Sequence, residues 1–337
     1  MKILQFLGAI LLVLLIAAGS FLYKSSIPAG IIDARYESRL SQFLLMENGS
    51  RIHYRDEGNR RGEPIVLIHG SNASLHVWEP WVEILGEEFR MITLDLPGHG
   101  LTGAVPDEDY STDAFIKTID ATITHLGLEQ FTLGGNSMGG GVTWRYTLKY
   151  PEKVNAMLLI DASGLPEWRL DSTSDQSADE KETPIIFELL TKPWFRAIST
   201  KLDPYYFTKQ GVMLAYNNSP VVTDELIMRY YKLSLREGSR EATMKRFANW
   251  DVDSDKTFDL STISQPTLIL WGEEDALISL SVADKFDSLL PVAALVTFPD
   301  TGHMPMEEIP EKSAKAVREF MLALKAEPES KTKENSQ

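Results

Sequence analysis

The sequence contains no cysteine among its 337 residues. This absence excludes disulfides, a thiolate nucleophile and metal sites built on thiolates. It also excludes a lipoprotein, because no cysteine is present to carry the lipid. It does not indicate a redox compartment, since a chain without cysteine tolerates oxidising and reducing surroundings alike.

Positive charge is also scarce. Lysine and arginine together number 33 against 48 aspartate and glutamate residues, which gives a formal net charge of −15. An acidic surface repels phosphate backbones, so a nucleic-acid partner is disfavoured. Apolar residues make up 43% of the chain, an ordinary share that predicts a globular protein with a core of normal size.

Two cofactor motifs are missing from the sequence, the lysine-containing phosphate loop and the zinc motif H-E-x-x-H. Residues 98–103 do match G-x-G-x-x-G, but a dinucleotide site needs a helix to open directly after the glycines. Here Ala104-Val105-Pro106-Asp107 follows, and helical spacing begins only near Thr112. We therefore expect a structural turn at this place and no metal or organic cofactor.

The longest apolar run, Ile3 to Tyr23, carries no charged residue. About 20 apolar residues suffice for a helix to cross a bilayer, so the run predicts an N-terminal transmembrane anchor at residues 1–24. A cleaved signal peptide is the alternative, for which Ala17-Ala18-Gly19 offers small residues. A very short N-terminal side usually stays in the cytoplasm. The expected location is therefore membrane-anchored, with the catalytic domain on the periplasmic or extracytoplasmic side.

Apolar runs alternate with helical patterns from Ser41 onward. Residues 65–68 and 91–94 are typical of fully buried strands, and residues 112–126 repeat apolar side chains at helical spacing. This alternation favours an α/β fold with a parallel sheet covered on both faces. It stops at Leu165, in a polar and aromatic-rich stretch with helical patterns, and resumes at Thr267.

These changes in pattern divide the chain into an anchor, a linker, a core in two parts, an inserted helical region and a charged tail expected to be flexible. The predicted bounds are, in that order, residues 1–24, 25–40, 41–164 with 263–324, 165–262, and 325–337. The aromatic side chains of the insert admit two interpretations, as the lining of an acyl pocket or as packing between insert and core.

The most informative motif is Gly135-Asn136-Ser137-Met138-Gly139, a G-x-S-x-G match between a predicted strand and a predicted helix. This context is typical of a nucleophile elbow, a tight turn that exposes a serine hydroxyl at a helix N-terminus. The flanking glycines leave room for neighbouring backbone. Ser137 is therefore the candidate nucleophile.

A serine hydroxyl needs a base. In this type of fold the chain order is serine, acid, histidine, and His303 is the only histidine after Ser137. Of the five others, we expect His53 to be an exposed strand residue, while His69 and His99 organise loops. The candidate acid is Asp275, with Glu273, Glu274 and the more distant Asp161 as alternatives; they are placed after strand-like runs.

An oxyanion hole needs two backbone N–H groups. One is expected from Met138, the residue after the nucleophile. The other is expected from the loop His69-Gly70-Ser71-Asn72 after an earlier strand, with Ser71 as the donor and Asn72 as the alternative.

With these pieces in place the chain resembles the capped serine hydrolases of the α/β-hydrolase superfamily. The resemblance is carried by motifs in matching order: His69-Gly70, Asp95-Leu96-Pro97-Gly98-His99-Gly100, Gly135 to Gly140, Gly272 to Asp275, and Gly302-His303. It covers Ser41 to Leu324 and implies an eight-stranded, mostly parallel sheet with a helical cap. One departure is Ser279, where many members carry a proline, and it weakens the assignment of the acid.

Two branches with a serine nucleophile are similar to this chain. Membrane-anchored monoacylglycerol lipases and bacterial lipases share the N-terminal span and the elbow. Carbon–carbon bond hydrolases acting on meta-cleavage products also use G-N-S-M-G-G, but their loop after His-Gly is usually rich in glycine and proline, whereas here it is Ser71-Asn72-Ala73-Ser74. We therefore expect a carboxylesterase or lipase acting on a small ester or lipid, with the carbon–carbon hydrolase as the alternative. A binding protein without activity is disfavoured, because all three triad candidates are present.

Overall fold

The structure is a computed structural model, and it describes residues 5–6, 22–165, 192–248 and 258–334. Within these ranges one sheet of eight strands organises the chain, in the order β1-β2-β4-β3-β5-β6-β7-β8. The strands are β1 (Ser41–Leu45), β2 (Arg51–Gly58), β3 (Pro64–Ile68), β4 (Arg90–Leu94), β5 (Phe131–Asn136), β6 (Val154–Ile160), β7 (Thr267–Gly272) and β8 (Ala293–Phe298). β1 pairs antiparallel with β2, and β2 antiparallel with β4; the other neighbours are parallel. The predicted α/β-hydrolase fold with a mostly parallel eight-stranded sheet is confirmed.

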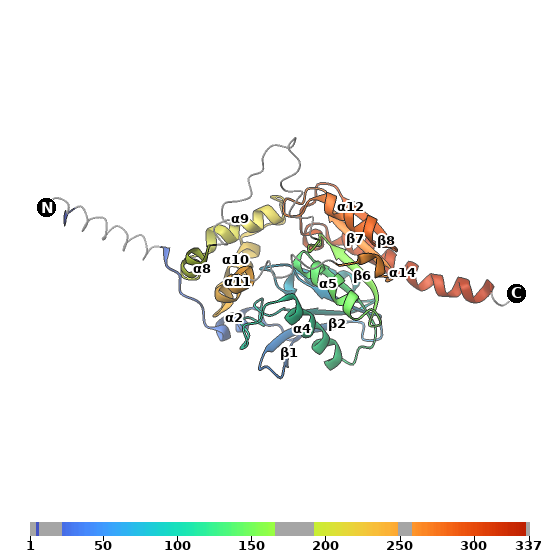
Figure 1. Ribbon diagram of the computed structural model, residues 1–337, viewed down its shortest axis with the longest axis horizontal. Helices are drawn as coiled ribbons and strands as arrows, with labels where there is room; N and C mark the ends of the chain where they lie inside the picture. The colour runs from blue at the N-terminus through green and yellow to red at the C-terminus, as the bar shows by residue number, and fades with distance from the viewer. Residues whose placement is uncertain (1–4, 7–21, 166–191, 249–257, 335–337) are drawn as a thin grey trace.

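Helices cover the sheet on both faces, as the apolar strands require (Figure 1). On β3, Val66 and Ile68 join the core cluster packed under α4 and α5, while Ile65 and Leu67 join the cluster packed under α3 and α14. Successive side chains of a strand point to opposite faces, so a strand buried on both sides is apolar throughout. The covering helices are α3 (Glu79–Leu85), α4 (Thr112–His125), α5 (Met138–Lys149), α12 (Leu280–Leu289) and α14 (Pro310–Glu334), with the short α13 (Pro305–Glu308) and the 3-10 turns η1 (Leu75–Trp78) and η2 (Leu260–Thr262).

In the described residues between β6 and β7, four helices form a group at one side of the sheet, in the place of the predicted cap (Figure 1). They are α8 (Pro193–Ser199), α9 (Tyr205–Ala215), α10 (Asp224–Ser234) and α11 (Ser239–Ala248). Their aromatic side chains divide between two environments: Tyr231 is buried, whereas Trp194 and Tyr206 are 60% and 65% exposed. Trp194 and Tyr206 therefore neither pack against the core nor line an enclosed pocket.

The segment before β1 is attached to these cap helices. Tyr23 forms an isolated bridge with Leu202, and Ile27 forms one with Arg236. The helix α2 (Ala29–Tyr36) follows, and its Asp33 accepts two hydrogen bonds from the Arg236 guanidinium, at 2.8 and 3.2 Å. Residues 25–40, expected to be a linker, thus contain a helix that is tied to the cap.

The predicted membrane location requires correction. Among the described residues, no helix combines the length and the apolar character that crossing a membrane requires. This finding stands against an N-terminal anchor with the catalytic domain outside the cytoplasm. The apolar run that suggested the anchor, residues 3–23, lies almost entirely outside the described residues. At the other end of the chain, α14 continues to Glu334, past the expected end of the core at Leu324.

A buried carboxylate holds together the loops at the carboxyl ends of β3 and β4. Asp95 is fully buried and accepts hydrogen bonds from the backbone N–H groups of Leu75 and Leu101, at 2.7 and 2.8 Å, and from Nδ1 of His53 at 2.7 Å. Burial alone raises the pKa of Asp95, but the hydrogen bond from His53 and the nearby histidine rings outweigh it and hold the pKa well below its usual range. His53, expected to be exposed, is fully buried because its ring faces this carboxylate.

The G-x-G-x-x-G turn packs against this carboxylate. A Cβ on Gly100 would lie 2.1 Å from the Asp95 carboxyl, and the backbone of Gly100 has a positive φ of 49°. Only glycine fits so close an approach without displacing the acid. The turn is followed by irregular chain until α4 begins at Thr112, in agreement with its interpretation as a structural turn.

We predict that Asp95→Asn lowers the free energy of unfolding by about 3–5 kcal/mol, as expected when one partner is removed from a buried charged network. The new amide would direct N–H donors at groups that are themselves donors. Urea denaturation measures this loss. The control is Asp120→Asn, a half-buried partner of Lys153 and Tyr146, for which the loss should stay below about 1 kcal/mol. Equal losses in the two variants would contradict the role given to Asp95.

Candidate active site

Ser137 occupies a sharp turn between β5 and α5. It is the N-cap of α5, with φ 54° and ψ −120°. Residues other than glycine rarely adopt such a positive φ. Its backbone N–H donates to the carbonyl of Ile160 at the end of β6, 3.0 Å away, so the turn is held against the neighbouring strand. The geometry is that of a nucleophile elbow.

The glycines of the motif are required by close backbone contacts. A Cβ on Gly135 would lie 2.3 Å from the carbonyl carbon of Gly139, and one on Gly139 would lie 2.2 Å from the carbonyl oxygen of Ile68. No real Cβ tolerates such contacts with backbone. The tight approach of α5 to β3 and β5 therefore explains why the serine is flanked by glycine.

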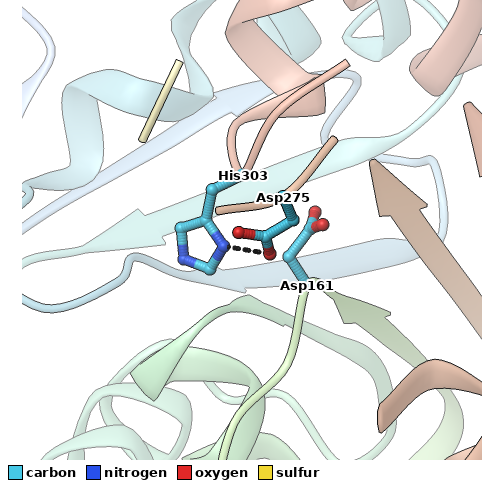
Figure 2. A group of neighbouring side chains, drawn as sticks. All are labelled: Asp161, Asp275 and His303. Carbon is cyan, nitrogen blue, oxygen red and sulfur yellow. Dashed lines mark hydrogen bonds and ion pairs between the residues drawn. The ribbon is translucent and has the colours of Figure 1, made fainter. Parts of the chain in front are cut away.

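His303 and Asp275 form a direct pair. Nδ1 of the His303 ring lies 2.6 Å from Oδ2 of Asp275, and both side chains are buried (Figure 2). The other oxygen, Oδ1 of Asp275, accepts from the N–H groups of Leu277 and Ile278 at 2.7 and 3.1 Å, which fixes the carboxylate. A carboxylate on Nδ1 leaves Nε2 as the ring nitrogen available for proton transfer.

Two of the other candidate acids, Glu273 and Glu274, are not bonded to the ring. Glu273 accepts from Thr297 Oγ1 at 2.7 Å and is exposed. Glu274 is exposed as well. Of the four sequence candidates, Asp275 alone is bonded to the histidine in the part of the chain that the structure describes.

The loop that carries His303 lies against the elbow. The side-chain amide of Asn136, the residue before the nucleophile, donates to the carbonyl oxygen of His303 at 3.0 Å. Ser137 and His303 follow β5 and β8, whose carboxyl ends lie at the same edge of the sheet, where open α/β folds place their sites. The Ser137 hydroxyl is not hydrogen-bonded to the His303 ring, and in free enzymes this bond is often long and tightens only with substrate.

The loop expected to supply one oxyanion donor lies close to the serine. A Cβ on Gly70, the residue before Ser71, would lie 3.1 Å from Cβ of Ser137. Asn72 has a positive φ of 59°, which marks a tight turn in this loop. Met138 is the first residue of α5, and the first N–H groups of a helix have no acceptor within it.

One residue at this loop was missed by the sequence analysis. Arg246 of α11 is buried, and its Nη2 donates to Oδ1 of Asn72 at 3.2 Å, while Nη1 lies 3.8 Å from the sulfur of Met138. Burial lowers the pKa of its guanidinium to about 10. The sequence offered no signal for it, since Arg246 stands in a polar helix without a motif.

Asp161 forms the third member of a compact group with the pair. It follows β6 with a positive φ of 44°, and its Oδ1 accepts from the N–H of Gly272 at 2.9 Å. One ligand-type atom of each of Asp161, Asp275 and His303 lies within 4.8 Å of the others (Figure 2). Burial, and then the negative charge of Asp275, raise the pKa of Asp161 well above its usual range and so favour its neutral form.

The same group does not suit a cation. Nδ1 of His303 and Oδ2 of Asp275 form a direct hydrogen bond of 2.6 Å, which leaves no space for an ion between them. The raised pKa of Asp161 further disfavours the negative charge that a metal would need. The arrangement fits proton transfer and orientation of an imidazole instead.

Comparison with known proteins identifies the family. A family model for the alpha/beta hydrolase fold matches residues 63–310, and the chain therefore belongs to this family. Lipase 1 of Psychrobacter immobilis is 25% identical over 286 residues, 84% of each chain. The 2-hydroxy-6-oxo-2,4-heptadienoate hydrolase of Pseudomonas putida is 26% identical over 288 residues, 83% of this chain and 96% of that one. A solved meta-cleavage product hydrolase from Pseudomonas fluorescens IP01, at 25% identity, covers 84% of this chain and 98% of its own with a TM-score of 0.69. The protein is a hydrolase, and the proteins similar to it include both lipases and dienoate hydrolases.

We predict that the two neighbouring carboxyls differ in their effect on turnover. Asp275→Asn should lower kcat by about 10³- to 10⁴-fold, because an amide on Nδ1 favours the wrong tautomer of the imidazole. Asp161→Asn should change kcat less than fivefold, on the order of 1 kcal/mol or less, because asparagine reproduces a neutral carboxyl that accepts from Gly272. The measurement is steady-state hydrolysis of a p-nitrophenyl ester. The reverse order would assign the role of the acid to Asp161.

The raised pKa of Asp161 predicts a pH-dependent stability. Below about pH 4 the carboxyl is protonated in both the folded and the unfolded protein. As the pH rises, the unfolded chain releases the proton while the folded protein keeps it, so wild-type stability falls relative to Asp161→Asn by up to about 1.4 kcal/mol per pH unit. Urea denaturation at pH 5 and pH 8 should show that Asp161→Asn is more stable relative to wild type at pH 8 than at pH 5. For an exposed control, Asp287→Asn, the difference in stability from wild type should be the same at both pH values. The same result for Asp161→Asn would mean that the Asp161 carboxyl is ionised in the folded protein.

Proposed function

We propose that this protein is a serine hydrolase that cleaves carboxylic esters through an acyl-enzyme, with lipidic acyl esters as the favoured class. The observation that carries the proposal is the 2.6 Å pair between His303 and Asp275, on a loop bonded to the residue before Ser137. A base oriented by a carboxylate beside a serine in a strained turn is the arrangement used to activate a hydroxyl.

In the proposed reaction the Nε2 atom of His303 takes the proton of the Ser137 hydroxyl as its oxygen attacks the ester carbonyl. Asp275 holds the ring and stabilises its charged form. The N–H groups of Ser71 and Met138 donate hydrogen bonds to the carbonyl oxygen and stabilise the negative charge that develops on it. His303 then gives its proton to the leaving alcohol, and in the second half it takes a proton from the water that releases the acid.

The choice of esters rests on the loop after β3. It reads Ser71-Asn72-Ala73-Ser74, without the glycine-proline-glycine pattern usual in carbon–carbon hydrolases, and lipases are among the similar proteins. The second candidate is hydrolysis of a carbon–carbon bond in a vinylogous diketone. It is favoured by the G-N-S-M-G-G elbow and by similarity to meta-cleavage product hydrolases.

The experiment that separates the two offers the purified protein a series of p-nitrophenyl esters of increasing acyl length, monoacylglycerols, and a 2-hydroxy-6-oxo-dienoate. We expect turnover of the acyl esters and none of the dienoate. Ser137→Ala should lower ester turnover by about 10⁴-fold or more and abolish labelling by a fluorophosphonate. The exposed Ser288→Ala is the matched control and should equal wild type. Dienoate turnover without ester turnover would establish the second candidate, and activity that survives Ser137→Ala would exclude both.

A further inference from the structure

A buried polar network links the cap to the loop that carries the candidate base. Glu307 of α13 accepts a hydrogen bond from the hydroxyl of Tyr216, which directly follows α9, and one from Nη2 of Arg229 on α10 at 2.6 Å. The hydroxyls of Tyr216 and Tyr230 lie 3.1 Å apart. The side chain of Glu307 is 10% exposed and Tyr216 is 1% exposed, so water does not compete for these bonds.

The backbone of the histidine itself is bonded to the same end of the cap. The N–H of His303 donates to the carbonyl of Ala215, the last residue of α9, at 2.7 Å. A Cβ on Gly302 would lie 2.7 Å from that carbonyl oxygen, so the loop and the helix end are in direct contact. From the other side, the carboxylate of Glu308 accepts from the N–H groups of Gly302 and Met304, both at 3.0 Å. The loop is thus held between α9 and α13.

The hydrogen bonds of this network all point toward the carboxylate of Glu307. Burial, and then the proximity of Tyr230 and Glu307, raise the pKa of Tyr216 well above its usual range, so its hydroxyl remains a donor across the working range of pH. The pKa of Arg229 is raised as well; burial opposes this, but the carboxylate of Glu307 outweighs it. Two donors therefore converge on one carboxylate, and removal of either leaves a buried charge with one bond fewer.

We propose that Glu307 is a positioning residue: by binding Tyr216 and Arg229 it locks the end of α9 against α13 and thereby fixes the backbone of His303, and with it the place of the imidazole between Asp275 and Ser137. The cap is then part of the catalytic apparatus at this end, since the backbone N–H of His303 donates to Ala215 of the cap. The proposal rests on the proposed function, in which His303 is the base.

The tests are Tyr216→Phe, which removes a single oxygen, and Glu307→Gln, which removes the charge and keeps the shape. The matched control is Tyr206→Phe, which removes the same hydroxyl from an exposed position of α9. We expect both test variants to lower kcat about tenfold with KM within twofold of wild type, because the base is displaced rather than the substrate. Rates are normalised to the sites labelled by a fluorophosphonate.

Two further measurements distinguish positioning from a merely structural role. The acid limb of the pH profile of kcat/KM should move to lower pH, because a displaced ring gains less from Asp275; the carboxyls that face His303 or its loop, Asp275, Asp161 and Glu308, are unchanged in these variants. The far-downfield proton signal of the bond between His303 Nδ1 and Asp275, assigned by its loss in Asp275→Asn, should shift or broaden in Tyr216→Phe and stay unchanged in Tyr206→Phe.

A lower melting temperature with unchanged kcat, pH profile and downfield signal would overturn the proposal and leave Glu307 as a structural link only. The downfield signal is read without substrate. A wild-type protein without ester turnover would therefore refute the proposed function, while the signal would still decide whether the network positions His303.

Discussion

The candidate site depends on one strained turn, the positive φ of Ser137 between β5 and α5. This conformation lifts the side chain out of the sheet. It requires a close approach of β3, β5 and α5, and that approach leaves no room for a Cβ at Gly135 or Gly139. The strained conformation is maintained by the rigid packing around the turn and by the hydrogen bond from the Ser137 N–H to Ile160. The strands β7 and β8 run parallel to β5 in the same sheet, and the loops after them bring Asp275 and His303 to the same edge.

Features encoded in local patterns were predicted from the sequence. The apolar runs and their spacing gave the parallel sheet and its covering helices, and the elbow and the late histidine stand in short motifs whose chemistry requires those residue types. The pairing of Asp275 with His303 was one of four possibilities that the sequence left open, and in the structure Asp275 is the acid bonded to the ring, while Asp161 lies close by without a bond to it.

Features that depend on contacts between distant segments were not predictable. His53 looks like an exposed strand residue until Asp95, 42 positions later, is brought against its ring. Arg246 and Glu307 lie in polar helical patterns, and their partners stand on other elements far along the chain. The sequence predicts a linker where α2 lies, because the weak apolar pattern of this segment does not indicate the ion pair between Asp33 and Arg236. The predicted membrane location was wrong as well, because no helix among the described residues has the length and apolar character needed to cross a membrane.

The attachment of residues 22–36 to the cap has a practical consequence for protein engineering. The family match begins at residue 63. A gene shortened to that boundary would delete β1, β2 and the N-terminal segment that is bonded to Leu202 and Arg236. Arg236 would then keep its buried position without the carboxylate of Asp33, an uncompensated cation inside the domain. Expression vectors for this hydrolase should therefore retain the segment from residue 22 that is bonded to the cap.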